Sequence, residues 1–194
     1  MRRPLVVGIS GASGAAYGIR LLEVLKDHPE VATHLVVTKP AERTIAEETS
    51  RDLAGVRALA AAVHPVSDVG APIASGSFLT MGMVVVPCSI RTASAIASCQ
   101  ADNLLTRAAD VTLKEGRRLI LVVRETPLHR GHLKVLLSAS ENGAVILPPM
   151  PAFYTRPRTV EEIVDHTVAR ILDQIGIAHE LSSRWGDERS KPSP

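Results

Sequence analysis

Short, almost wholly apolar runs alternate with helical patterns along most of the chain. The apolar runs lie at residues 5–9, 34–37, 83–86, 119–123 and 144–147, and the helical patterns at 14–26, 40–49, 92–115, 133–140 and 159–175. Strands that are apolar throughout are buried on both faces, which is typical of a parallel sheet covered by helices. The alternation therefore predicts an α/β fold with a mostly parallel sheet and helices on both faces.

The chain is expected to form one domain with a short tail. Its 194 residues suit a single compact unit, which we place at residues 1–181. The polar segment 182–194 ends in Lys-Pro-Ser-Pro, so we expect the end of this tail to be disordered. Two local signals refine the helices: a break is expected near Asp102 and Asn103, and Thr159 with Glu162 forms a capping-box pattern.

Composition argues against several classes of protein. A net charge of +2 lacks the basic excess of most nucleic-acid-binding surfaces. No apolar stretch has the length of a membrane span, and the apolar run after Met1 is too short for a signal peptide. Cys88 and Cys99 show no metal-type spacing and suit a reducing compartment. We therefore expect a cytoplasmic protein that binds neither nucleic acid nor membrane.

A glycine-rich loop joins the first predicted strand to the first predicted helix. Residues 8–14 read Gly-Ile-Ser-Gly-Ala-Ser-Gly, which can present backbone N–H groups to an anion at a helix N-terminus. A tight turn with no ligand would need the same glycines. The spacing differs from the dinucleotide fingerprint, and Thr38 stands where an acidic residue would contact a ribose. These features favour a mononucleotide such as FMN over NAD.

A second loop of the same kind follows the third predicted strand. Residues 87–92 read Pro-Cys-Ser-Ile-Arg-Thr and lead into a helix rich in small residues. Hydroxyl groups and an arginine at a helix start suit an anion, although Ser89 or Thr92 could simply cap the helix. Ligands of open α/β sheets bind beyond the carboxyl ends of the strands, and both loops are expected there.

Eight segments, taken in order, resemble the UbiX-like flavin prenyltransferase family over residues 4–177. They are GASGA at 11–15, ASGSF at 74–78, VPCS at 86–89, DNL at 102–104, RAADV at 107–111, LKE at 113–115, RE at 124–125 and PPMPAFY at 148–154. The resemblance implies a Rossmann-like or flavodoxin-like subunit in a large homo-oligomer, typically a dodecamer. It also implies transfer of a dimethylallyl group from dimethylallyl phosphate to N5 and C6 of reduced FMN. The product, prenylated FMN, would serve a UbiD-type decarboxylase.

The resemblance also implies roles for individual residues. It implies that the flavin is bound by Gly11, Ala12, Ser13, Thr38, Ser89, Ile90, Arg91, Thr92 and Arg124. It implies that the prenyl phosphate is bound by Arg107, Lys114, Tyr154 and Arg170, and that Trp185 lies near the prenyl group. Ser13 and Glu125 form a polar pair near the reacting centre, and Glu48 matches an acidic residue lent by a neighbouring subunit.

Without the resemblance, several of these residues have simpler explanations. Arg107 and Lys114 lie at helical spacing and could form a solvated row of ion pairs with Asp110. Arg170 could lie along the flank of its helix, and Glu125 could be a surface carboxylate. Cys88 is expected to be a packed small residue rather than a nucleophile.

Two rival functions remain open at this stage. The first is an FMN-dependent decarboxylase of the phosphopantothenoylcysteine type, which would use a histidine in the early helix region, where residues 14–26 have none. The second is a non-catalytic flavin carrier subunit, which would not need Lys114, Tyr154 and Arg170 together. No metal is expected, because the aspartates are scattered and the pair His129 and His132 lacks a third ligand.

Overall fold

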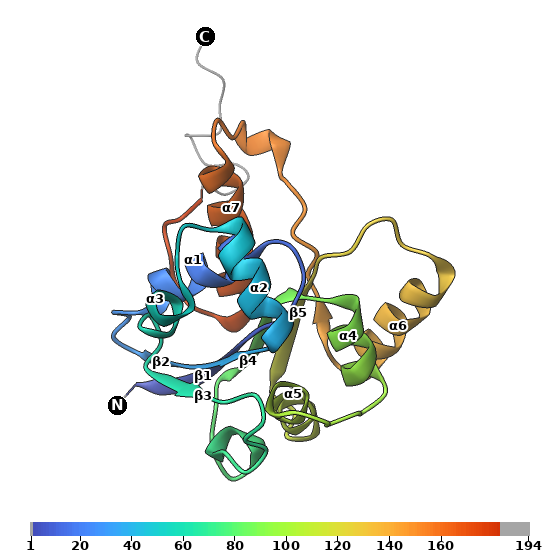
Figure 1. The fold of residues 1–194 in the computed structure, drawn as a ribbon. Coiled ribbons are helices and arrows are strands. Elements are labelled where there is room, and N and C mark those ends of the chain that lie inside the picture. The colour runs from blue at the N-terminus through green and yellow to red at the C-terminus, as the bar shows by residue number, and fades with distance from the viewer. Residues whose placement is uncertain (1, 183–194) are drawn as a thin grey trace.

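The computed structural model describes residues 2–182, which form a six-stranded parallel sheet between two layers of helices (Figure 1). The elements in chain order are β1 (Arg3–Ile9), α1 (Ala15–Leu25), β2 (Val31–Val37), α2 (Lys39–Glu48), α3 (Leu53–Arg57), β3 (Ala62–His64), η1 (Pro72–Ala74), β4 (Gly82–Cys88), α4 (Ile90–Ala97), α5 (Leu104–Lys114), β5 (Arg118–Val123), α6 (Arg130–Glu141), β6 (Val145–Ile146), η2 (Phe153–Thr155) and α7 (Val160–Ile175). This confirms the predicted α/β fold.

The strand order is β3-β2-β1-β4-β5-β6, with every neighbouring pair parallel. The chain first builds outward from β1 through β2 to β3, then returns to place β4 on the other side of β1. The direction of winding therefore reverses between β1 and β4. In open α/β sheets, this reversal opens a crevice at the carboxyl ends of the two strands.

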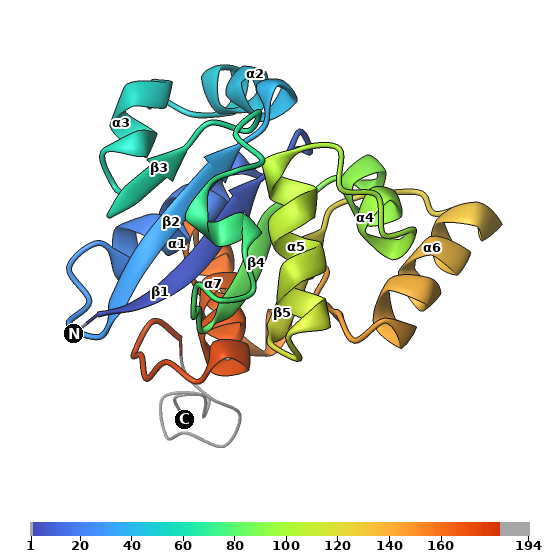
Figure 2. The same ribbon diagram turned by 90° about the horizontal axis from the view of Figure 1, so that it is seen from below.

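Alternate side chains of each strand feed two separate cores, one on each face of the sheet. On one face, Leu5 and Val7 of β1 pack with α1, α2 and α7. On the other, Val6 of β1 packs with α4 and α5. Figure 2 shows α5 in front of the sheet and α7 behind it. Helices α5 and α7 therefore cover opposite faces.

The helix boundaries follow local capping chemistry. The predicted helix 92–115 is broken into α4 and α5, as expected near Asn103, because Asn103 and Thr106 form a reciprocal capping box at the start of α5. Thr159 caps α7 by accepting from the N–H of Glu162. The capping-box expectation is only half right, since the Glu162 carboxylate accepts from the N–H of Arg158 rather than from Thr159.

Four short elements were missing from the sequence prediction, two of them the three-residue 3-10 helices η1 and η2. Helix α3 has five residues, and β3 is a three-residue edge strand whose side chains are half-buried or exposed. Elements this short bury too little apolar surface to leave a periodic pattern. No helix within residues 2–182 is long and apolar enough to cross a membrane.

Candidate active site

The two predicted loops lie side by side beyond the carboxyl ends of β1 and β4. Residues 10–14 follow β1 directly, and Ser89 follows β4. Thr38 follows β2, and Arg124 follows β5. Because these four strands are neighbours and parallel, their carboxyl ends bring all the predicted flavin-binding residues to one edge of the sheet.

Ser10, which the sequence did not single out, joins the two loops. Its hydroxyl donates to the carbonyl of Pro87 at 3.1 Å and accepts from the N–H of Ser89 at 2.8 Å. The residue is 1% exposed. The sequence could have identified Ser10 by its place, because it is a serine that directly follows a buried strand where the direction of winding reverses. It fixes the glycine loop relative to the start of α4.

The glycine loop packs tightly against the start of α2. Gly14 has a φ of 102°, in the left-handed region that favours glycine. A Cβ on Gly11 would lie 2.3 Å from the Cβ of Pro40, so no larger residue fits there without movement. Ala12 is buried, whereas Ser13 is exposed and available to a ligand. The predicted tight turn and the predicted ligand loop are thus compatible.

Glu48, at the end of α2, lies against the loop of its own chain. Its Oε2 accepts from the N–H of Gly14 at 2.8 Å and from the N–H of Ala15 at 3.0 Å. These N–H groups stand at the start of α1 and have no partner within the helix, and the helix dipole favours a carboxylate there. Glu48 therefore contacts the glycine loop of its own chain, and the role at a neighbouring subunit that the resemblance implies stays a prediction.

Thr38 supplies a buried hydroxyl with nothing to bind. It is the N-cap residue of α2, but its side chain makes no capping hydrogen bond. Its Oγ1 is buried without a hydrogen-bond partner among the described residues. A buried hydroxyl that lacks a partner costs free energy, so such groups usually face a ligand or an ordered water. The position at the carboxyl edge suits a polar group of FMN.

The second loop begins α4 with a serine cap. Ser89 Oγ accepts from the N–H of Thr92 at 3.2 Å and donates to its hydroxyl at 3.0 Å. The simple capping explanation is thus correct for Ser89, and Arg91 projects as an exposed cation beside it. Cys88 is fully buried, and burial raises the pKa of its thiol, so it is a packed residue rather than a nucleophile.

Arg124 and Glu125 complete the edge beyond β5. The N–H of Arg124 donates to the carbonyl of Cys88 at 3.1 Å, which ties it to the second loop. Burial raises the pKa of Tyr17, and the positive charge of Arg124 opposes that rise. Glu125 Oε1 accepts from the N–H of Thr126 at 3.2 Å. A cation and a carboxylate therefore stand beside the loops.

The four predicted phosphate-binding residues separate into two groups. Tyr154 and Arg170 belong together: the Tyr154 hydroxyl lies 3.3 Å from His166 Nε2, and His166 is one turn from Arg170 on α7. Arg107 and Lys114 lie on α5, on the opposite face of the sheet. Trp185 lies outside the described residues.

Lys114 is also at the wrong edge of the sheet to meet the loops of its own chain. It ends α5 beside Gly76, whose Cβ would lie 2.9 Å from the Lys114 Nζ. Arg118, four residues after Lys114, pairs with Gly82 at the amino ends of β5 and β4. A strand of seven residues spans about 20 Å, so one chain cannot bring Lys114 to its own flavin loops.

These residues fit FMN as the bound nucleotide. Thr38 offers the unpartnered hydroxyl, the start of α4 and Arg91 suit a phosphate, and the glycine loop allows close approach of a ring system. His129 and His132 have ring centroids 3.6 Å apart. Within residues 2–182, no three His, Cys, Asp or Glu side chains cluster to hold a metal ion.

The fold and this edge define a flavoprotein. The family model described as "Flavoprotein" matches residues 1–172. The chain belongs to the UbiX-like flavin prenyltransferases within that family, as its relatives show. It is 54% identical over 183 residues to "Flavin prenyltransferase UbiX" of Escherichia coli K12, covering 93% of this chain and 97% of that one. It is also 54% identical to the protein of that name from Thauera aromatica, covering 93% of both chains.

A solved structure gives the same result. AnUbiX (PadA1), in complex with FMN and dimethylallyl pyrophosphate, superposes with a TM-score of 0.94 at 48% identity, covering 96% of this chain and 99% of that chain. The fold, the family and the enzyme class predicted from the sequence are therefore confirmed.

Proposed function

We propose that this protein joins the dimethylallyl group of dimethylallyl phosphate to reduced FMN. The carbon–oxygen bond to phosphate breaks as the dimethylallyl carbon bonds to N5 of the flavin, and N5 loses its proton. The prenyl double bond then takes up a proton, its tertiary carbon bonds to C6, and C6 loses a proton. Reduced FMN supplies the electron-rich acceptor when it is bound. The observation that carries the proposal is the presence of two sets of residues. The flavin loops meet at one sheet edge, and in the phosphate set Tyr154 and Arg170 lie together while Arg107 and Lys114 lie on the opposite face of the sheet.

In this proposal the loops bind and orient the flavin. The polar groups of the flavin are held by Thr38, Arg91, Arg124 and the start of α4. The glycine loop sets how closely the flavin ring approaches the backbone. Ser13 is exposed at the loop, and Glu48 and Glu125 lie at the same edge, so these three groups can hold or accept protons near N5 and C6.

The second set binds the phosphate and offsets its negative charge. Arg107, Lys114 and Arg170 are cations, and Tyr154 is a neutral hydrogen-bond donor. Charge-assisted hydrogen bonds to a phosphate are stronger than neutral ones, so three cations can stabilise the departing group. Trp185 is assigned to the prenyl group on the resemblance alone.

We further propose that each site is completed by neighbouring chains in a homo-oligomer. The separation of Lys114 from Arg124 across the sheet supports this, because one chain cannot assemble both sets. A structure described as a dodecameric FMN-dependent UbiX-like decarboxylase from Escherichia coli O157:H7 superposes with a TM-score of 0.93 at 50% identity. It covers 95% of this chain and 100% of that one. A dodecamer is therefore the proposed assembly.

The remaining parts of the proposal concern the product and its setting. Prenylated FMN would pass to a UbiD-type decarboxylase in the cytoplasm. Two rivals are kept: a cysteine-type flavin decarboxylase and a flavin carrier. Helix α1 contains no histidine, which disfavours the first, and the Tyr154–Arg170 group has no use in the second.

The deciding experiment is an anaerobic incubation with reduced FMN and dimethylallyl phosphate, followed by mass analysis of the flavin. The proposal expects a flavin heavier by one dimethylallyl unit. Arg170→Ala should retain FMN binding and lose this product. A carrier would return unmodified flavin with either protein, and that result would refute the proposal.

A further inference from the structure

Arg170, which is proposed to bind the phosphate, is held at one nitrogen of its guanidinium by a carboxylate. Its Nη1 donates to Asp173 Oδ2 at 2.7 Å, three residues later on α7. The other N–H groups of this guanidinium have no partner among residues 2–182. They form a fork of donors that can meet a phosphate at two points. The contact with Asp173 therefore limits the directions in which Arg170 can present that fork.

Asp173 is itself attached to a side chain of the interior. His179 Nε2 lies 3.1 Å from Asp173 Oδ1, so the two oxygens of one carboxylate have different partners. The exposed fraction of the side chain falls from 51% for Arg170 to 18% for Asp173 and 5% for His179. The three side chains therefore form a row that runs from the surface into the protein, and its inner end is a buried ring.

The turn after α7 brings His179 back to Asp173. Gly176 ends the helix with a φ of 73°, in the left-handed region that favours glycine. The N–H of Ile177 donates to the carbonyl of Leu172 at 3.0 Å, and the Ile177 side chain is buried. A reversal of this kind is closed by a hydrogen bond and an apolar contact. The position of His179 beside Asp173 is therefore set by the backbone.

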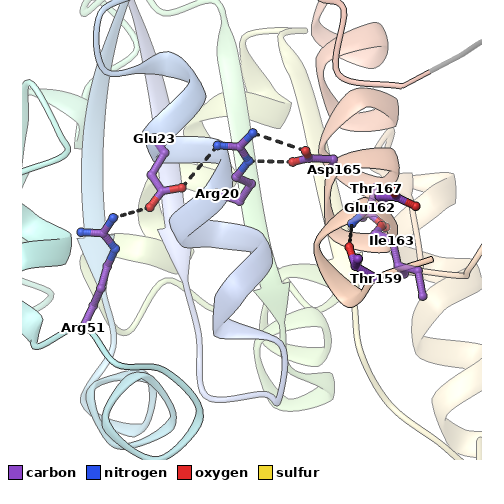
Figure 3. A network of polar contacts seen from close by, with 8 residues as sticks. All are labelled: Arg20, Glu23, Arg51, Thr159, Glu162, Ile163, Asp165 and Thr167. Carbon is purple, nitrogen blue, oxygen red and sulfur yellow. Dashed lines mark hydrogen bonds and ion pairs between the residues drawn. The ribbon is translucent and has the colours of Figure 1, made fainter. Parts of the chain in front are cut away.

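The start of α7 is fixed to α1 by ion pairs. Asp165 accepts from Arg20 Nε at 2.6 Å and from Arg20 Nη2 at 3.3 Å (Figure 3). Arg20 also pairs with Glu23 of α1, and Glu23 pairs with Arg51. A two-point guanidinium–carboxylate contact fixes direction as well as distance. With both of its ends held, α7 places Asp173 without help from a ligand.

A carboxylate beside a phosphate-binding arginine has two opposite effects. Its negative charge offsets that of Arg170 and repels an incoming phosphate, so on charge alone the loss of Asp173 would strengthen binding. A half-exposed arginine also loses conformational freedom when it binds a ligand, and a contact that already fixes the guanidinium reduces that cost. Because these effects differ in sign, substitution of Asp173 shows which of them dominates.

We propose that Asp173 and His179 are positioning residues for the phosphate: Asp173 fixes the direction of the Arg170 guanidinium, and His179 fixes Asp173. This inference rests on the proposed function, since it takes Arg170 as a ligand of the phosphate. Neither residue touches the phosphate or a reacting atom. Their effect is therefore expected in the affinity for the prenyl phosphate and not in the affinity for FMN.

Binding of dimethylallyl phosphate to the assembled protein, loaded with oxidised FMN, is measured by calorimetry in the absence of turnover. Asp173→Leu removes the carboxylate and should bind dimethylallyl phosphate about fivefold more weakly than wild type, with FMN affinity unchanged. The matched control is Glu161→Leu, which removes an exposed carboxylate from the first turn of the same helix and should change the affinity less than about twofold. Tighter or unchanged binding in Asp173→Leu would overturn the inference, because the carboxylate would then only offset charge.

His179 is tested by two substitutions. His179→Gln can still donate to Asp173, whereas His179→Leu cannot. The affinity for dimethylallyl phosphate should fall about threefold in His179→Leu and be kept in His179→Gln. His179→Leu should add nothing in a protein that already carries Asp173→Leu, because the effect passes through that carboxylate. Equal losses in the two His179 variants would indicate packing alone and refute the inference.

The same titrations separate this inference from the proposed function. If wild type binds dimethylallyl phosphate but forms no prenylated flavin, the proposed function fails, and the variants still decide the roles of Asp173 and His179. If wild type binds no dimethylallyl phosphate, Arg170 is not its ligand and the inference fails.

Discussion

The Ser10 hydroxyl accepts a hydrogen bond from the N–H of Ser89 across 79 residues of sequence. The same oxygen donates to the Pro87 carbonyl, so one buried side chain closes the gap between the ends of β1 and β4. These two strands lie on either side of the winding reversal. The distance between the glycine loop and α4, and with it the shape of the flavin crevice, depends on this contact.

Removing that hydroxyl should loosen the crevice. Ser10→Ala leaves the half-buried N–H of Ser89 without its partner, which costs about 1–3 kcal/mol, whereas the Pro87 carbonyl keeps its hydrogen bond from the backbone N–H of residue 10. Urea denaturation should show the loss, and flavin titration should show weaker FMN binding. Ser140→Ala, on the exposed face of α6, is the control and should change neither. Unaltered stability in Ser10→Ala would show that water replaces the hydroxyl.

Thr38 should affect stability and binding in opposite directions. Thr38→Val removes a buried hydroxyl that has no partner and keeps the shape of the side chain, so the apoprotein should gain up to about 1 kcal/mol. FMN affinity should fall about fivefold, because the hydroxyl is proposed to bind the nucleotide. Melting curves with and without FMN measure both effects.

The matched control is Thr80→Val. Thr80 Oγ1 is also buried without a partner among the described residues, but it precedes β4 at the amino edge of the sheet. The gain in apoprotein stability should appear here without any loss of FMN affinity. Equal FMN affinity in Thr38→Val and wild type would remove Thr38 from the site.

Two inactive variants should restore activity when they share one oligomer. Lys114→Ala damages the phosphate set, Arg124→Ala damages the flavin loops, and the two positions belong to different edges of the sheet. In a random mixture, about a quarter of the sites receive an intact Arg124 from one chain and an intact Lys114 from another. Activity should therefore appear in co-expressed protein and be absent from each variant alone. Failure to recover activity would mean that a single chain supplies both residues.

Turnover should survive exhaustive chelation of divalent metals. Prenyl transfers from diphosphates commonly use Mg²⁺ to offset the leaving group, and here Arg107, Lys114 and Arg170 are proposed to do so. The rate of prenylated flavin formation, with metal content measured in parallel, tests this. Activity that disappears with chelator and returns with Mg²⁺ would contradict it.

Stability should fall on mild acidification because of His34 and His64. Their ring nitrogens lie 2.9 Å apart on β2 and β3, and burial is the largest cause that lowers the pKa of each. The folded protein therefore binds protons less readily than the unfolded chain, whose histidines titrate near pH 6.5. Stability is complete above that pH and is lost progressively below it. Urea midpoints between about pH 7.5 and 5.5 should fall less in His64→Gln than in wild type.

Much of the fold could be predicted from the sequence, because each long helix or strand has a recognisable apolar or capping pattern. Continuous apolar runs marked β1, β4 and β5, and Asn103 marked the break before α5. The three-residue strand β3 was missed because its two ends carry half-buried side chains and its centre an exposed valine. Short edge strands depend on a neighbouring strand for their hydrogen bonds, and sequence periodicity does not report that contact.

The resemblance proposes members of the candidate site but not their arrangement. It assigns Glu48, Lys114 and Arg170 to the site without saying which face or edge each would occupy. Only the packing shows that α5 and α7 cover opposite faces. Ser10 escaped notice for a related reason: it acts through a contact with Ser89, which lies 79 residues away in the chain.

The hydrogen bonds of Glu48 to Gly14 and Ala15 give the flavin loop a tethered competitor. A carboxylate fixed to the adjacent helix is present at a high effective concentration, so any anion that seeks those two N–H groups must first displace it. The observed affinity of such an anion is the intrinsic affinity reduced by the fraction of time that the carboxylate is away. The loop therefore discriminates against ligands whose negative charge would fall at the start of α1. It admits those whose charge is received elsewhere, beside Thr38 and the start of α4.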